Sequence, residues 1–126
     1  MIEDIQNDSS IENIILGYLQ TPVDILQLST NTFGCYVIKK LIECVNEDRR
    51  LPLNFVIISN FEKLAMDMHG ILIIKPFLQK CKDNINKEQI VNIISKDFFN
   101  LCQNQFSNFI IQDILEVKDF IFILIV

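Results

Sequence analysis

Three segments of the chain share one residue pattern and follow one another at a nearly constant spacing. In each, a small residue precedes a variable residue, an aromatic residue or leucine, two β-branched residues, a long polar residue, a variable residue and an apolar pair. The small residues are Gly34, Gly70 and Ser107, which lie 36 and 37 residues apart. A repeat of this length is typical of stacked helical solenoids.

The apolar residues within each segment have the spacing of a helix face. The first segment carries a broad apolar stripe at Val37, Ile38, Leu41, Ile42 and Val45. Shorter helices are expected before the three segments, at 23–28, 61–66 and 97–102. Closing helices are expected after the first two segments, at 53–58 and 87–94, and residues 11–19 have the character of a closing helix from an earlier repeat.

We therefore predict an all-α protein, an α-solenoid of stacked three-helix repeats of about 36 residues each, truncated at both ends. The expected organisation is an N-terminal tail at 1–10, a closing helix at 11–20, repeats at 23–60 and 61–96, and a partial repeat at 97–126. The chain ends in an uninterrupted apolar run, Phe120–Val126. We interpret this run as a truncation or an incorrectly assigned gene end and expect it to promote aggregation.

Composition narrows the class of protein further. Half of the 126 residues are apolar and 21% are charged, which excludes intrinsic disorder. No apolar run is long enough to span a bilayer, and the acidic N-terminus does not resemble a signal peptide, so we expect no membrane partner. We expect an intracellular protein, in the cytoplasm or alternatively in the nucleus or nucleolus. The net charge of −5 argues against a protein that binds nucleic acid mainly by neutralising phosphates.

The sequence contains no recognisable catalytic or metal-binding constellation. No nucleophile is accompanied by a nearby histidine and carboxylate, and no glycine-rich phosphate loop is present. The four cysteines lack the spacing of metal ligands and are expected to be reduced thiols: Cys35, Cys44, Cys81 and Cys102. We expect neither enzymatic activity nor a cofactor.

The three segments resemble the repeats of the Pumilio (PUF) family of RNA-binding proteins. The resemblance covers about residues 11–117 and rests on the pattern described above, which in the family continues with glutamine at the long polar position and glutamate after the apolar pair. It implies that the middle helix of each repeat lines a concave surface, where each repeat reads about one base of single-stranded RNA. The implied ligand is the 3′ untranslated region of messenger RNA, and the implied role is post-transcriptional regulation.

Carried over position by position, the resemblance assigns three residues of each repeat to RNA. Residues at i and i+4 share one helix face and can address one base edge, while the residue at i+1 can stack between bases. The assigned residues are Cys35, Tyr36 and Lys39 in the first repeat, Ile71, Leu72 and Lys75 in the second, and Asn108, Phe109 and Gln112 in the third. The combination of Asn108 and Gln112 is similar to those that select uracil in the family. Lys39 replaces the usual glutamine and can only donate hydrogen bonds.

The second repeat departs furthest from the family pattern. It carries Ile71 in place of a polar reader and Leu72 in place of an aromatic stacker. Pro76 is expected to kink the helix because it lacks a backbone N–H. We do not expect this repeat to read sequence.

Simpler interpretations of the same residues stay open. Asn108 and Gln112 can be ordinary exposed polar residues, the aromatic residues can pack between repeats, and the lysines can be solvated charges. Six phenylalanines are expected in the core: Phe33, Phe55, Phe61, Phe77, Phe98 and Phe99. Two other functions are also open, a helical scaffold that binds proteins, on its concave or convex face, and a nucleolar relative that acts on structured RNA in ribosome biogenesis.

Overall fold

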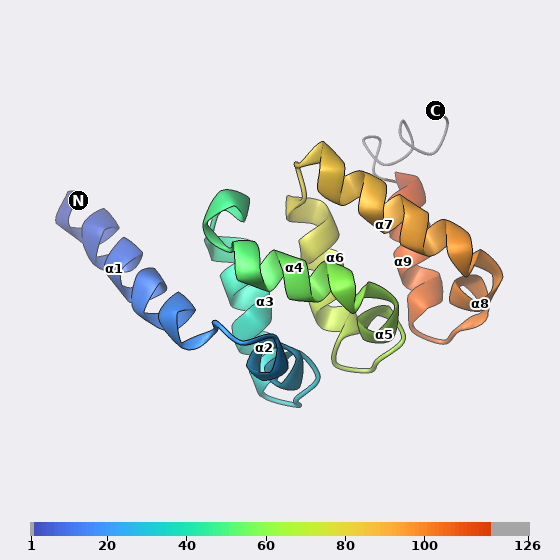
Figure 1. The fold of residues 1–126 in the computed structure, drawn as a ribbon, viewed down its shortest axis with the longest axis horizontal. Coiled ribbons are helices and arrows are strands. Elements are labelled where there is room, and N and C mark those ends of the chain that lie inside the picture. The colour runs from blue at the N-terminus through green and yellow to red at the C-terminus, as the bar shows by residue number, and fades with distance from the viewer. Residues whose placement is uncertain (1, 117–126) are drawn as a thin grey trace.

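The computed structural model describes residues 2–116, and within them it contains helices and no strand (Figure 1). A short 3-10 turn, η1 (Glu47–Arg49), precedes the fourth helix. The α-helices are α1 (Ile2–Tyr18), α2 (Pro22–Ser29), α3 (Gly34–Cys44), α4 (Leu51–Ser59), α5 (Phe61–Ala65), α6 (Ile71–Lys80), α7 (Asn84–Lys96), α8 (Phe98–Gln103) and α9 (Ser107–Glu116). The apolar run Phe120–Val126, and the expectation about it, lie outside the described residues.

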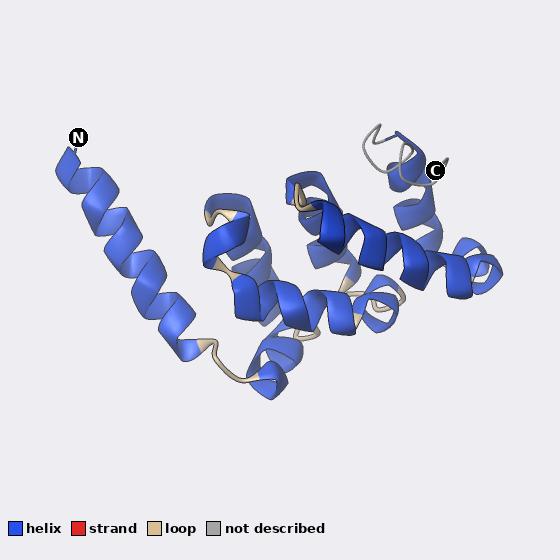
Figure 2. Cartoon of the chain, turned by 45° about the horizontal axis from the view of Figure 1, so that its top comes forward, coloured by secondary structure: helices blue, strands red, loops and turns tan. Residues whose placement is uncertain are grey.

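The helices form successive repeats of three. Helices α2, α3 and α4 make the first repeat, α5, α6 and α7 the second, and α8 and α9 begin the third. The middle helices α3, α6 and α9 pack in a row, α3 against α6 and α6 against α9, and the closing helices α4 and α7 cross one side of that row (Figures 1 and 2). This arrangement confirms the predicted all-α solenoid. Helix α1 begins at Ile2 rather than near residue 11.

The core is built from equivalent positions of the repeats. The second β-branched residue and the first residue of the apolar pair are buried in each middle helix, as Ile38, Ile74 and Phe77 illustrate. Burying such side chains contributes about 25 cal/mol per Å² of apolar surface removed from water, which holds the stacked helices together.

Four of the six phenylalanines expected in the core lie instead on the surface. Phe61 and Phe77 are buried as predicted, whereas Phe33, Phe55, Phe98 and Phe99 are exposed. In α4 the core-facing positions belong to Leu53, Val56 and Ile57, so Phe55 between them points outward. The expectation failed for the helical phenylalanines because the exposure of a side chain in a helix depends on the face on which its position lies, whatever its hydrophobicity, and Phe33 lies in the turn before α3.

Each middle helix begins with the same capping hydrogen bonds. The side-chain oxygen of Asn31 accepts from the backbone N–H groups of residues 33 and 34, both at 2.9 Å. Asp67 accepts from residues 69 and 70 at 2.9 and 2.8 Å, and Asn104 from residues 106 and 107 at 2.8 and 3.1 Å. These bonds satisfy donors that the first turn of a helix leaves unpaired. The cap therefore sets where each middle helix starts, and with it the register of the residues predicted to contact RNA.

The small residue of each repeat lies where the middle helix approaches the helix before it. A Cβ atom on Gly70 would lie 2.5 Å from the carbonyl oxygen of Leu64, and one on Gly34 would lie 2.8 Å from that of Leu28. In the third repeat the Oγ atom of Ser107 donates a hydrogen bond to the carbonyl oxygen of Leu101 at 2.7 Å. The close approach explains why this position carries a glycine or a serine in every repeat.

A buried arginine joins the first repeat to the second. Arg50 donates from Nε to the carbonyl oxygen of Val45 at 3.1 Å and makes a second hydrogen bond to the side chain of Asn54. Its guanidinium lies 5.7 Å from the ring centroid of Phe77 in α6, a cation–π contact. Burial lowers the pKa of Arg50, and the charge of Glu47 opposes that effect. This cluster helps to fix α6 relative to α3.

Candidate nucleic-acid interface

The nine residues assigned to RNA occupy three equivalent positions on the three middle helices. Because α3, α6 and α9 pack side by side, the positions are repeated from one helix to the next across one continuous row (Figure 1). The first position is held by Cys35, Ile71 and Asn108, the second by Tyr36, Leu72 and Phe109, and the third by Lys39, Lys75 and Gln112. What each repeat presents at these positions differs.

The third repeat presents a hydrogen-bonded pair of amides. Gln112 donates from Nε2 to Oδ1 of Asn108 at 3.0 Å, and Asn108 donates from Nδ2 to the carbonyl oxygens of Asn104 and Gln105 at 2.8 and 3.1 Å. Both N–H groups of the Asn108 amide are therefore used within the protein. Gln112 keeps its carbonyl oxygen and one N–H, an adjacent acceptor and donor that can pair with a base edge. The ring of Phe109 is half exposed beside the pair, with 52% of its surface accessible.

The first repeat presents an aromatic ring and a lysine but no polar pair. Tyr36 is exposed and Lys39 is half-buried. Cys35 is fully buried, and its thiol lies 3.6 Å from the carbonyl oxygen of Thr32. In this structure Cys35 therefore does not reach the surface beside Lys39 as Asn108 does beside Gln112, and its contact with a base stays a prediction.

The second repeat presents half-buried apolar side chains, Ile71 and Leu72, and the exposed Lys75. Pro76 is buried inside α6, which continues through it to Lys80. The proline therefore does not end the helix, but it leaves the carbonyl group of Leu72 without the N–H donor that an α-helix normally supplies.

An ion pair connects the second and third repeats across this surface. The Nζ atom of Lys75 lies 3.6 Å from Oδ2 of Asp113 on α9. Half of the Lys75 side chain is accessible to solvent, so the ion pair contributes at most about 1 kcal/mol to stability. Lys75 can therefore leave Asp113 for another partner at little cost in free energy. Sequence alone does not link Lys75 to Asp113, which lies 38 positions further along the chain. The only signal was that Asp113 directly follows the third RNA position.

Charge is distributed unevenly along the row of middle helices. Helices α3 and α6 together carry one acidic residue, Glu43, against four lysines: Lys39, Lys40, Lys75 and Lys80. Helix α9 carries Asp113 and Glu116 and no basic residue. Although the net charge of the chain is −5, α3 and α6 together carry an excess of positive charge.

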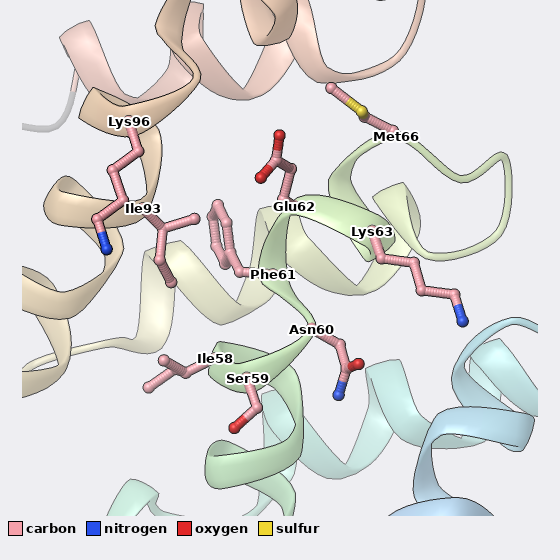
Figure 3. Close-up of a pocket in the computed structure, with 9 residues that line it drawn as sticks. All are labelled: Ile58, Ser59, Asn60, Phe61, Glu62, Lys63, Met66, Ile93 and Lys96. Carbon is pink, nitrogen blue, oxygen red and sulfur yellow. The ribbon is translucent and has the colours of Figure 1, made fainter.

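Away from the row of middle helices, a hollow of about 570 Å³ lies at the junction of α4, α5 and α7. Figure 3 shows the Phe61 ring and the Ile93 side chain pointing toward one another within it, with Glu62 at its edge. A hydrogen bond with Asp97, followed by partial burial and the charge of Asp97, raises the pKa of Glu62. The residues that line the hollow include no histidine or cysteine.

Residues 2–116 contain neither a candidate metal site nor a candidate membrane-spanning helix. No group of three or more histidine, cysteine, aspartate or glutamate residues there could hold a metal ion. No helix in the same region is both long enough and apolar enough to cross a membrane.

Comparison with known proteins identifies the repeats. A family model described as the Pumilio-family RNA binding repeat matches residues 24–53, 60–96 and 97–119. The Arabidopsis thaliana protein named putative pumilio homolog 8, chloroplastic, is 22% identical over 153 aligned positions, which cover 93% of this chain and 30% of that protein. Pumilio homolog 12 of the same organism is 26% identical over 109 residues, 84% of this chain and 17% of that protein. The chain thus spans less than a third of the length of these relatives.

Two solved structures share the fold. The Puf3 RNA binding domain bound to the Cox17 RNA 3′ UTR recognition sequence site B matches with a TM-score of 0.65 and 26% identity, over 71% of this chain and 25% of that one. The Puf4 RNA binding domain bound to the HO endonuclease RNA 3′ UTR recognition sequence matches with a TM-score of 0.68 and 24% identity, over 76% of this chain and 30% of that one.

Proposed function

The chain belongs to the Pumilio family, and from this premise we propose that it binds single-stranded RNA along α3, α6 and α9. The observation that carries the proposal is the amide pair of Asn108 and Gln112 beside the half-exposed ring of Phe109. These three side chains supply an acceptor, a donor and a stacking surface at one place, which is what recognition of an unpaired base requires.

The three repeats would contribute unequally to RNA binding. In the third, Gln112 pairs with the donor and acceptor edge of uracil, as the resemblance to uracil-selecting repeats implies, and Phe109 stacks on the base. In the first, Tyr36 stacks and Lys39 donates to a base acceptor or a phosphate. In the second, Lys75 leaves Asp113 and contacts a phosphate, while Ile71 and Leu72 read no sequence. The chain would act without catalysing a reaction.

Fluorescence anisotropy with short uracil-, adenine- and cytosine-rich RNAs tests this proposal. We expect preference for the uracil-rich RNA and a loss of affinity of about 5- to 150-fold for Phe109→Ala, since stacking contributes about 1–3 kcal/mol per base. Phe55→Ala is the matched control, because Phe55 is 67% exposed on the closing helix α4. If Phe109→Ala and Phe55→Ala bind alike, the residue assignment is wrong.

The amide pair has its own matched control. Asn108→Ala and Gln112→Ala are expected to lower both affinity and the preference for uracil, while Asn92→Ala and Gln89→Ala, exposed on α7, leave both unchanged. Loss of affinity without loss of preference would assign the pair to backbone contacts instead of base reading.

We further propose that the RNA is the 3′ untranslated region of messenger RNA and that the chain acts in post-transcriptional regulation in the cytoplasm. The solved relatives named above are bound to 3′ UTR sequences, which supports this choice. Crosslinking in cells followed by sequencing of the bound RNA, together with imaging of a fluorescent fusion, tests it. Recovery of ribosomal RNA precursors from a nucleolar protein would favour the alternative role in ribosome biogenesis.

A protein-binding role is the second candidate, favoured by the exposure of two large apolar residues, Leu51 and Phe55, on α4. Ionic strength separates the two functions. RNA binding weakens as salt rises because counterions are released from the phosphates, whereas an apolar protein contact does not weaken in this way.

A further inference from the structure

The first RNA position points back along its own helix in two of the repeats. In the third repeat, Nδ2 of Asn108 lies 2.8 Å from the carbonyl oxygen of Asn104 and 3.1 Å from that of Gln105. In the first repeat, the thiol of Cys35 lies 3.6 Å from the carbonyl oxygen of Thr32. Side chains in a helix lean toward its N-terminus, which brings this position onto the preceding turn. The first position therefore contacts the protein itself in both repeats.

These contacts fix which way round the amide of Asn108 lies. Only its NH2 end can face two carbonyl oxygens, because its own oxygen accepts hydrogen bonds and cannot donate them. Oδ1 of Asn108 consequently lies at the opposite end, where it accepts the hydrogen bond from Nε2 of Gln112 at 3.0 Å. The carbonyl groups before α9 thus orient Asn108, and Asn108 in turn orients Gln112.

The two amides differ in what they leave for a ligand. Asn108 is half-buried and uses both of its N–H groups within the protein, whereas Gln112 is exposed and keeps Oε1 and one N–H. The hydrogen bond holds the nitrogen of Gln112 on the side of Asn108 and leaves Oε1 on the other side. Turning the Gln112 amide by half a rotation would exchange its donor and acceptor and break this hydrogen bond.

A fixed order of donor and acceptor can separate two bases of the same size. Uracil carries the acceptor O4 beside the donor N3–H, whereas cytosine carries the donor N4–H2 beside the acceptor N3. For a base stacked in one place, an amide that is held in one orientation therefore pairs with one of these edges. An amide that is free to turn pairs with either.

We propose that Asn108 is a positioning residue, which favours uracil over cytosine by holding the amide of Gln112 in one orientation and does not itself contact the base. The choice of base rests on the proposed function, whereas the orientation of Gln112 is a property of the protein without RNA. The other two repeats lack this device because their third position is a lysine, whose ammonium group has no acceptor to place.

Nitrogen-15 NMR of the full chain without RNA tests the orientation. The Nε2 group of Gln112 is expected to have one proton shifted downfield by its hydrogen bond, in contrast to that of Gln89, which is exposed on α7. Asn108→Ala should remove this difference. Asn108→Asp should retain it, because a carboxylate oxygen also accepts and is well tolerated in the first turn of α9. Wild-type signals of Gln112 that match those of Gln89 would overturn the proposal.

Base preference separates a positioning residue from a base reader. Fluorescence anisotropy with uracil-rich and cytosine-rich RNAs of equal length measures this preference for each variant. Asn108→Ala should reduce the preference by about 2- to 12-fold, the factor to which one hydrogen bond corresponds. Asn108→Asp should keep the preference, although its added charge lowers the affinity for both RNAs. If Asn108 donates to the base itself, Asn108→Asp loses the preference as Asn108→Ala does, and the proposal is wrong.

A double-mutant cycle completes the test. In a Gln112→Ala background, Asn108→Ala should leave the base preference unchanged, because no amide remains to be oriented. Losses of preference that add in the double variant would mean that Asn108 contacts the base independently, which contradicts the proposal. A wild type that binds no RNA would overturn the proposed function and with it the choice of base, while the NMR spectra still decide the orientation of Gln112.

Discussion

Of the three glycines, Gly70 approaches the neighbouring helix most closely, which makes it the most sensitive of them to how the repeats pack. A Cβ atom there would lie 2.5, 2.8 and 3.0 Å from the carbonyl oxygen, Cα and carbonyl carbon of Leu64. All three are backbone atoms, so no side-chain rotation can relieve the overlap. The start of α6 must then move away from α5, which disturbs the fully buried Ile73 and Ile74 next to it.

The other two glycines complete a graded series of the same substitution. At Gly34 the nearest atoms are Cδ2 and the carbonyl oxygen of Leu28, both at 2.8 Å, and the first of these belongs to a flexible side chain. At Gly17, inside α1, no atom lies within 4 Å of the added methyl group. No glycine among the described residues has a positive φ, so the backbone geometry itself accepts alanine at all three positions.

The expected free energies follow from these distances. Overpacking should make Gly70→Ala less stable by about 1–3 kcal/mol, with Gly34→Ala at the lower end of that range. Gly17→Ala should gain about 0.5–1 kcal/mol from helix propensity. All three variants restrict the unfolded chain to the same extent, so their differences report the folded state alone.

Urea unfolding followed by circular dichroism measures the series. The expected order of stability is Gly17→Ala, then wild type, then Gly34→Ala, then Gly70→Ala. A Gly70→Ala protein as stable as the wild type would refute the reasoning, because it would mean that α5 and α6 can separate freely at this point.

Three further predictions concern caps and titrating groups. Asn104→Ala removes the hydrogen bonds to the N–H groups of residues 106 and 107 and should lower the free energy of unfolding by about 1 kcal/mol. Asn104→Asp keeps an acceptor oxygen and should retain the stability of the wild type. Equal stability of the two variants would contradict the capping role. The raised pKa of Glu62 means that the folded state binds its proton more tightly than the unfolded state, so stability falls as pH rises above about 4.5. Glu62→Gln should therefore be more stable than the wild type at neutral pH and should lose that advantage in acid. Urea titrations at the two pH values measure the difference. Burial, followed by the charge of Glu47, raises the pKa of Cys81 to about 12, so the free energy of unfolding should fall as pH rises from about 9. Cys81→Ala should reduce this dependence on pH in the same assay. An unchanged dependence would assign the alkaline loss of stability to another group.

The fold was predictable because its signals are local. The stripe that begins at Val37 and Ile38 sets the helix face within eleven residues of α3, and the 36-residue spacing repeats it. The middle helices, the short helices before them and the closing helices α4 and α7 lie where these patterns indicated, whereas α1 begins earlier than expected. Position on a face also accounts for the amide pair of Asn108 and Gln112, since residues four apart on a helix are neighbours.

What sequence could not supply were relations between helices. The burial of Cys35 depends on its surroundings in the folded chain and not on its place in α3. The pairing of Lys75 with Asp113 depends on how closely α9 stacks on α6. Arg50 looks like a surface residue in the sequence, and only the fold shows its hydrogen bonds to buried groups and its contact with Phe77. The recurring Asn31, Asp67 and Asn104 were a usable signal for the caps, at a constant distance before each small residue.

The net negative charge of the chain is compatible with the proposed RNA surface when the positions of the individual charged residues are considered. A protein that depends on phosphate contacts needs many basic residues in one groove. The lysines at positions assigned to RNA are Lys39 and Lys75, and Lys75 would first have to leave Asp113, so on the proposed surface electrostatic attraction would supply only a small part of the binding. Two phosphate contacts on single-stranded RNA correspond to a slope of about −1.4 in a plot of log affinity against log salt. On this proposal the rest would come from stacking on Tyr36 and Phe109 and from the amide of Gln112, interactions that salt screens little. A Pumilio surface of this composition should therefore discriminate between bases more strongly than it attracts RNA in general.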